Sequence, residues 1–141
     1  MTEFRSTLQS VISELFFRDH ARPVEWINLL TLSAWLQFLI TRAADFAGPR
    51  YPAFAALSPT VWALVIAAIV AAQLVAMWPT AKSSFIRFGA MTMAAGMWTV
   101  IAISFWVQAD TAPISARTNT VLAIAAAVSS IYLGVGAGRR R

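Results

Sequence analysis

Four long apolar segments dominate this sequence, and nearly all of its charged residues lie between them. The segments cover approximately Val24–Thr41, Pro59–Trp78, Phe85–Val107 and Thr118–Ala137. Each is close to the ~20 residues that an α-helix needs to cross a hydrocarbon core about 30 Å thick. We therefore expect an all-α, polytopic membrane protein with four transmembrane helices in an antiparallel bundle.

The composition supports a membrane environment. Of the 141 residues, 59% are hydrophobic and 12% are charged, whereas soluble domains have about 25% charged residues. The apolar segments show no alternation of polar and apolar residues, which excludes a transmembrane β-barrel. The chain has no cysteine, so it has no disulfide, thiolate metal site or cysteine nucleophile.

The pattern predicts three parts. Residues 1–22 form an amphipathic segment, residues 23–138 form the transmembrane domain, and residues 139–141 form a basic tail. The expected helices cover about 24–45, 59–78, 84–108 and 115–137, with Ser58 and Pro59 typical of a helix start. In the first segment the apolar residues follow one helical stripe: Phe4, Leu8, Val11, Ile12, Leu15 and Phe16. This stripe would lie in the headgroup region or pack on the protein's own cytoplasmic face.

The basic residues predict the orientation in the inner membrane. With four spans, one side of the membrane receives eight of them: Arg5, Arg18, Arg22, Lys82, Arg87, Arg139, Arg140 and Arg141. The other side receives three: Arg42, Arg50 and Arg117. Because basic loops stay in the cytoplasm, we expect both termini to be cytoplasmic.

Aromatic and basic residues near the ends of the spans are expected at the membrane interface. Trp26 and Trp78 would lie at the cytoplasmic interface, and Trp62 and Trp106 at the outer one. Arg87 would extend from the first turn of the third span to the headgroups. The tail residues Arg139, Arg140 and Arg141 would hold the C-terminus inside and attract anionic lipid.

Small residues recur at helical spacing on three spans and predict close helix packing. These residues are Ala63, Ala67 and Ala71 on the second span, Gly89 and Gly96 on the third, and Ala126, Ser130 and Gly134 on the fourth. Such faces pack helices within one chain or between chains. A bundle of this size has little interior for a pore, so a channel would need several subunits.

No catalytic, metal-binding or cofactor-binding residues are predicted. His20 is the single histidine and has no cluster of possible ligands around it in the sequence. Glu25 would pair with Arg22 close to water, although a proton-coupling carboxylate is an alternative. We expect no buried charge in any span. The chain is therefore expected to be neither an enzyme nor a nucleic-acid-binding protein.

The layout resembles that of bacteriophage holins and holin-like proteins. The resemblance rests on the hydrophobic spans, the short hairpin loop around Lys82 and the basic end at Arg139–Arg141. It implies accumulation in the inner membrane, lateral oligomerisation through small-residue faces and sudden permeabilisation. Two alternatives stay open: an accessory subunit of a larger membrane complex, and a small proton-coupled transporter that uses Glu25. The expected partners are the lipid bilayer and either further copies of the chain or a larger complex.

Overall fold

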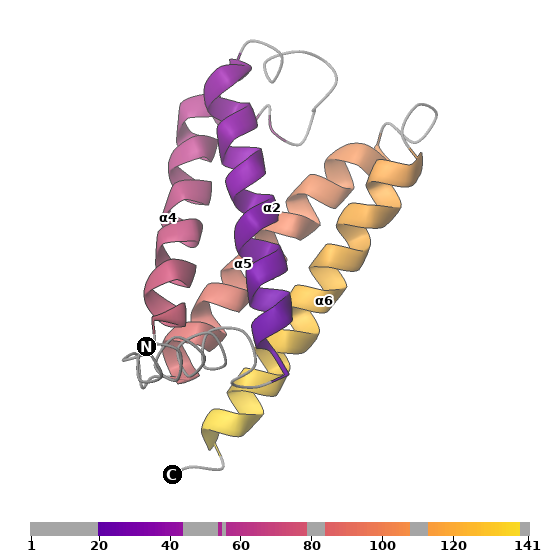
Figure 1. The fold of residues 1–141 in the computed structure, drawn as a ribbon. Coiled ribbons are helices and arrows are strands. Elements are labelled where there is room, and N and C mark those ends of the chain that lie inside the picture. Colours follow the sequence, from indigo (N-terminus) through magenta and orange to yellow (C-terminus); the bar gives the residue numbers. More distant parts are fainter. Residues whose placement is uncertain (1–19, 44–53, 55, 79–83, 108–112, 139–141) are drawn as a thin grey trace, which may run out of the picture.

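In the part of the chain that the structure describes, the fold consists of four long helices. A computed structural model describes residues 20–43, 54, 56–78, 84–107 and 113–138. The helices are α2 (Arg22–Thr41), α4 (Pro59–Met77), α5 (Ser84–Trp106) and α6 (Pro113–Gly138) (Figure 1). Within these ranges no residue belongs to a β-strand, and all four helices are long and apolar enough to cross a membrane. This confirms the predicted all-helical chain with four candidate membrane spans.

The boundaries of α2 differ from those predicted. The helix starts at Arg22, with Pro23 in its first turn, where a missing backbone N–H is tolerated. It ends at Thr41, four residues before the expected end at 45. Arg42 leaves the helical conformation, at φ −129° and ψ 35°, while its N–H still donates to the carbonyl of Phe38 at 2.8 Å. The stripe expected in residues 2–17 lies outside the described residues, as does the tail 139–141.

The starts of α4 and α6 follow from local chemistry. The hydroxyl of Ser58 accepts a hydrogen bond from the N–H of Val61 at 3.4 Å, and Pro59 occupies the first turn. This is the N-cap that the sequence predicts. In α6 the helix begins at Pro113, two residues before the expected start, because a proline's fixed φ suits a first helical position.

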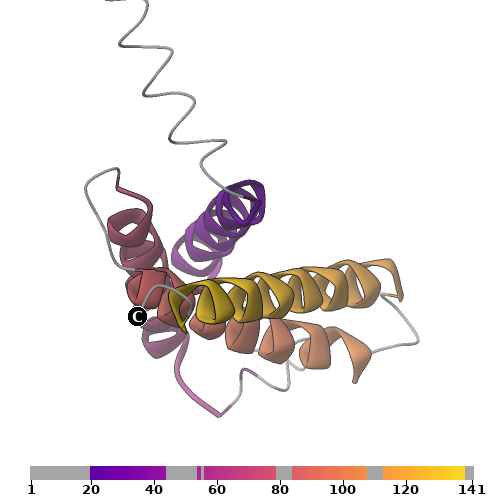
Figure 2. The same ribbon diagram turned by 90° about the horizontal axis from the view of Figure 1, so that it is seen from below.

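The helices pack as two neighbouring pairs. α5 and α6 share the most extensive interface and lie side by side in both views (Figures 1 and 2). α2 packs mainly on α4, and α4 also contacts α5. The contact between α2 and α6 is much smaller. The structure therefore has a tight α5–α6 pair and a looser junction between α2 and α6.

The interior is filled by large apolar side chains from all four helices. Deeply buried members of this core include Leu32 of α2, Ile66 of α4, Met91, Trp98 and Ile101 of α5, and the smaller Ala126 of α6. An aromatic group continues this core. The rings of Trp35 and Phe54 stack at a centroid distance of 6.3 Å, and Phe105 meets Trp35 edge-on at 6.1 Å. The centre of a single chain is thus closely packed.

The outer surface is apolar on every helix. Large hydrophobic side chains are more than half exposed on α2 (Leu30), α4 (Leu64), α5 (Phe85) and α6 (Ile131). A soluble protein rarely exposes apolar surface of this extent. The outward faces therefore suit contact with lipid.

The predicted small-residue faces differ in how far they are buried within the chain, and the face of α6 is the most buried. On α6, Ala126 is fully buried, and a Cβ added to Gly134 would lie 3.1 Å from the ring of Phe88 on α5. The hydroxyls of Ser130 and Thr92 are 2.6 Å apart. This face of α6 therefore packs on α5 within the chain.

The predicted faces of α4 and α5 contribute less to that interior. Ala63 packs against the core, Ala67 is half-buried and Ala71 is exposed. A Cβ added at Gly89 or Gly96 of α5 would meet no described atom within 4 Å. The two glycines are thus not used for close packing among the described residues.

Candidate functional site

A buried ion pair links the first turn of α2 to the first turn of α5. Glu25 and Arg87 are only 2% and 6% exposed. The carboxylate accepts two hydrogen bonds from the guanidinium: Arg87 Nε lies 2.7 Å from Oε1, and Nη2 lies 2.9 Å from Oε2. This is a bidentate pair, the strongest geometry available to these two groups.

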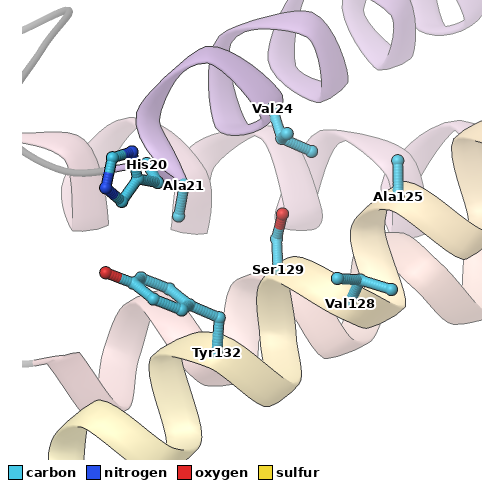
Figure 3. Close-up of a pocket in the computed structure, with 7 residues that line it drawn as sticks. All are labelled: His20, Ala21, Val24, Ala125, Val128, Ser129 and Tyr132. Carbon is cyan, nitrogen blue, oxygen red and sulfur yellow. The ribbon is translucent and has the colours of Figure 1, made fainter.

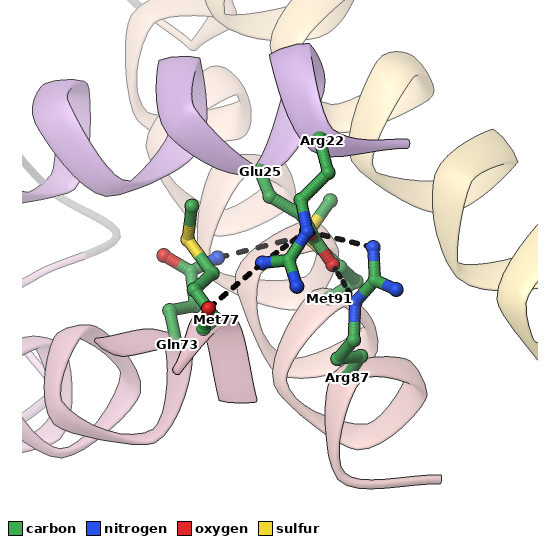
Figure 4. Close-up of polar contacts among 6 residues, drawn as sticks. All are labelled: Arg22, Glu25, Gln73, Met77, Arg87 and Met91. Carbon is green, nitrogen blue, oxygen red and sulfur yellow. Dashed lines mark hydrogen bonds and ion pairs between the residues drawn. The ribbon is translucent and has the colours of Figure 1, made fainter. Parts of the chain in front are cut away.

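Arg22 extends the pair to α4. Its Nη1 lies 3.5 Å from Oε2 of Glu25 and donates to the carbonyl of Met77 at 3.2 Å. Met77 is the last residue of α4, and the last carbonyls of a helix lack intrahelical donors. A cation there also complements the helix dipole. We call Arg22, Glu25 and Arg87 the ion cluster; it joins α2, α4 and α5 (Figure 4).

The described surroundings of the ion cluster are closely packed. Gln73 of α4 donates through Nε2 to the sulfur of Met91 on α5 at 3.7 Å, and its buried Oε1 has no hydrogen-bond partner among the described residues. The space enclosed by Glu25, Gln73, Met77, Arg87 and Met91 has no room for a water molecule. Charges in such a place are held by one another and by protein dipoles.

Two expectations are corrected by these contacts. Arg87 does not extend to the headgroups, because its side chain points inward and is taken up by Glu25. The expectation that no span contains a buried charge is also wrong, since all three members of the ion cluster are buried. The predicted pairing of Arg22 with Glu25 is present, but away from water.

A second polar contact lies one turn further along α2. The amide oxygen of Asn28 accepts a hydrogen bond from the indole N–H of Trp98 at 2.5 Å, and both residues are fully buried. The Asn28 amide nitrogen donates to the carbonyl of Val24 at 2.9 Å. This hydrogen bond joins α2 to α5. It also gives the buried indole N–H of Trp98 an acceptor in the core.

Two other polar residues of α5 make hydrogen bonds within their own helix. Thr99 and Ser104 return their hydroxyls to carbonyls of their own helix, at Ala95 and Val100. His20 is exposed, with its ring centroid 6.5 Å from that of Tyr132. In the described part of the chain, no three His, Cys, Asp or Glu residues are grouped as a metal site would require.

The predicted interface tryptophans differ in exposure. Trp78 and Trp106 are 66% and 48% exposed, while Trp26 and Trp62 are half-buried. The indole N–H of Trp62 donates to the carbonyl of Phe54 at 2.9 Å. The indole N–H of Trp62 is therefore bonded within the chain and not to a lipid headgroup.

The ion cluster engages both oxygens of the Glu25 carboxylate. Each oxygen accepts a hydrogen bond from the guanidinium of Arg87, and Nη1 of Arg22 lies 3.5 Å from Oε2. Such an arrangement holds helices in place, because separating them would leave buried charges unpaired.

Sequence reasoning misses the cluster for an identifiable reason. Arg22 and Glu25 are three residues apart, but Arg87 is 62 residues further along the chain. One signal in the sequence points to the cluster. If the four helices cross a membrane in alternating directions, the starts of the first and third spans are expected on the same side, where their charged residues can meet.

Comparisons with known proteins do not assign this site. No family model matches the chain, and neither the search of curated proteins nor the search of solved structures finds a match. Its function is therefore inferred from its own residues.

Proposed function

We propose that this chain is a small inner-membrane protein that acts by self-assembly, in which several copies associate through α5 and permeabilise the membrane in a holin-like manner. The observation that carries the proposal is the outward face of α5. There, glycines stand at positions where nothing in the described chain requires a small residue. The proposed role needs no catalytic group.

The glycine positions favour a partner helix. Gly89, Gly96 and Ile103 follow one another at intervals of seven residues, which places them on one side of α5. Glycine inside a helix is about 1 kcal/mol less favourable than alanine. Close approach of a second helix offsets this cost, since helices in lipid associate through small residues.

The filled interior favours permeation between copies. Trp98, Ile101, Leu32 and Ile66 occupy the centre of the bundle and are fully buried. A water-filled path through this centre would require displacing them. An opening between neighbouring copies needs no such change.

We infer an antiparallel arrangement with both termini in the cytoplasm. The starts of α2 and α5 and the end of α4 meet at the ion cluster, which supports alternating helix directions. The excess of basic residues in the termini and the loop around Lys82 supports the cytoplasmic assignment.

The function is tested in bacteria that carry a membrane-potential dye. Induction of the wild-type chain is expected to cause abrupt depolarisation after a delay. Gly96→Leu places a bulky side chain on the assembly face and is expected to abolish or long delay depolarisation, at equal membrane levels. Ile131→Leu changes a 64% exposed residue of α6 and is expected to behave as wild type.

Two outcomes would contradict the proposal. Wild-type chain that reaches the membrane without depolarising it would exclude permeabilisation. If this non-depolarising chain co-purified with a different protein, the result would identify it as an accessory subunit. In that case a helix of the other protein would pack on the outward face of α5. Equal depolarisation by Gly96→Leu and wild type would exclude α5 as the assembly face.

A carrier function receives less support. It would require Glu25 to act as the proton carrier while it is paired with two buried arginines. Loss of substrate-driven proton flux in Glu25→Gln would be needed to establish it.

A further inference from the structure

The polar contacts that join α2 to α5 lie on one side of α5. Arg87 donates to the carboxylate of Glu25, and Trp98 donates to the amide oxygen of Asn28. Trp98 comes eleven residues after Arg87, which is about three turns of an α-helix. Both side chains therefore leave α5 in nearly the same direction, and both are buried.

The outward glycines of α5 lie on the opposite side from these contacts. Gly96 comes nine residues after Arg87, about two and a half turns, and so faces the other way. Gly89 comes two residues after Arg87, which is also roughly half a turn away. The rotation of α5 that turns Arg87 and Trp98 inward thus turns both glycines outward.

Backbone packing does little to fix this rotation relative to α2. The closely packed helix pairs are α5 with α6, α2 with α4, and α4 with α5. A groove of about 410 Å³ lies between α2 and α6, so α2 does not hold α5 by way of α6 (Figure 3). His20, Ala21 and Val24 line one side of this groove, and Ala125, Val128, Ser129 and Tyr132 line the other. Long polar side chains therefore link α2 to α5 across a distance that the backbones do not close.

Hydrophobicity also leaves the rotation of α5 open. Large apolar side chains occur on its outward side, such as Phe85 and Ile103, as well as on its inward side, such as Ile101. A helix that is apolar on all sides has no preferred side for the protein interior. Buried polar groups supply such a preference in other helical assemblies, where a single buried asparagine fixes the register of a coiled coil.

We propose that the Glu25–Arg87 and Asn28–Trp98 contacts fix the rotation of α5 and so direct its glycine side outward for assembly. We call these two contacts the rotational lock. The inference rests on the proposed assembly through α5, because it explains how that face is presented to another copy. Its four members are positioning residues, since they act on the assembly face from the opposite side of the helix.

Spin labelling of dispersed chains tests the rotation itself. A nitroxide is attached to Gly96→Cys in the wild-type background and in an unlocked background, and each chain is diluted in lipid vesicles. The unlocked background carries Arg22→Met, Glu25→Leu, Arg87→Met and Asn28→Leu, which remove both contacts and leave no buried charge in the ion cluster. We expect the oxygen accessibility of the label to be high in the wild-type background and to fall in the unlocked one, because α5 then adopts several rotations. A label at Ile131→Cys on α6 is expected to give the same value in both.

Oxidative cross-linking in native membranes extends the comparison to assembly. We expect the disulfide yield of Gly96→Cys to fall about tenfold in the unlocked background, because the loss of two polar contacts removes the preference for one rotation. Ser104→Ala is the matched control. It removes a buried hydroxyl of α5 that bonds within its own helix, and both measurements are expected to stay at their wild-type values.

The outcomes separate the rotational lock from the proposed function. Equal oxygen accessibility at position 96 in the two backgrounds would overturn the lock, even in a chain that assembles. A fall in accessibility without cross-linking of the wild-type background would support the lock and contradict assembly through α5. If circular dichroism shows that the unlocked chain does not fold, Asn28→Leu alone removes one contact and is expected to lower both measurements in part. Unchanged values for a folded Asn28→Leu chain would then overturn the lock.

Discussion

Replacing Glu25 with alanine is expected to destabilise the folded chain by about 3–5 kcal/mol, the usual loss when one partner of a buried ion pair is removed. The substitution removes the carboxylate that Arg22 and Arg87 share, while both guanidinium groups stay buried. Unfolding by denaturing detergent, followed by circular dichroism, measures the change in the free energy of unfolding. The result would appear as a large shift of the transition.

Two control variants show whether the loss of stability comes from breaking the buried ion pair. Arg117→Ala removes an exposed arginine of α6 and is expected to leave the transition nearly unchanged. The triple variant Arg22→Met, Glu25→Leu and Arg87→Met removes all three charges and is expected to recover much of the lost stability, since apolar residues replace buried ion pairs well. A Glu25→Ala variant as stable as wild type would show that the ion cluster does not hold α2, α4 and α5 together.

Trp98→Ala is expected to produce a loss of similar size, about 3–5 kcal/mol. Trp98 is fully buried in a core cluster to which all four described helices contribute, so truncation leaves a large cavity. It also removes the donor that satisfies the buried amide oxygen of Asn28. The same unfolding measurement applies.

Trp106→Ala is the matched control for this change. Trp106 lies on the same helix, is 48% exposed and donates its indole N–H to the hydroxyl of Thr120 at 2.9 Å. Its truncation is expected to have a much smaller effect. Equal losses for the two tryptophans would mean that Trp98 is not the central packing residue described here.

The sequence predicts the helices well because its apolar segments are long and uninterrupted. Pro59 and Ser58 mark the start of α4 correctly, since their effect is local. The end of α2 is predicted four residues too late, because nothing in the pattern before Gly48 signals that the backbone leaves the helix at Arg42.

The ion cluster could not be predicted in the same way. It depends on which helix faces which, and hydrophobicity alone does not specify the rotation of a helix that is apolar on all sides. Arg87 illustrates this point. An arginine near the end of a span can extend to the headgroups or turn inward to a carboxylate, and Glu25 decides between these outcomes.

The small-residue faces show a related limit. Gly134 and Gly96 look alike in the sequence, yet one lies against Phe88 and the other has no described atom nearby. Spacing identifies both as packing positions but does not say whether the partner is the same chain. The structure separates them, and this difference is the basis of the proposed assembly through α5.

Cysteine cross-linking at position 96 tests that assembly most directly. The chain contains no cysteine, so Gly96→Cys introduces a single thiol on the outward face of α5. We predict that mild oxidation in native membranes gives a covalent dimer in high yield, whereas Ile131→Cys on α6 stays largely monomeric. A monomeric Gly96→Cys chain, or equal cross-linking at positions 96 and 131, would contradict assembly through this face.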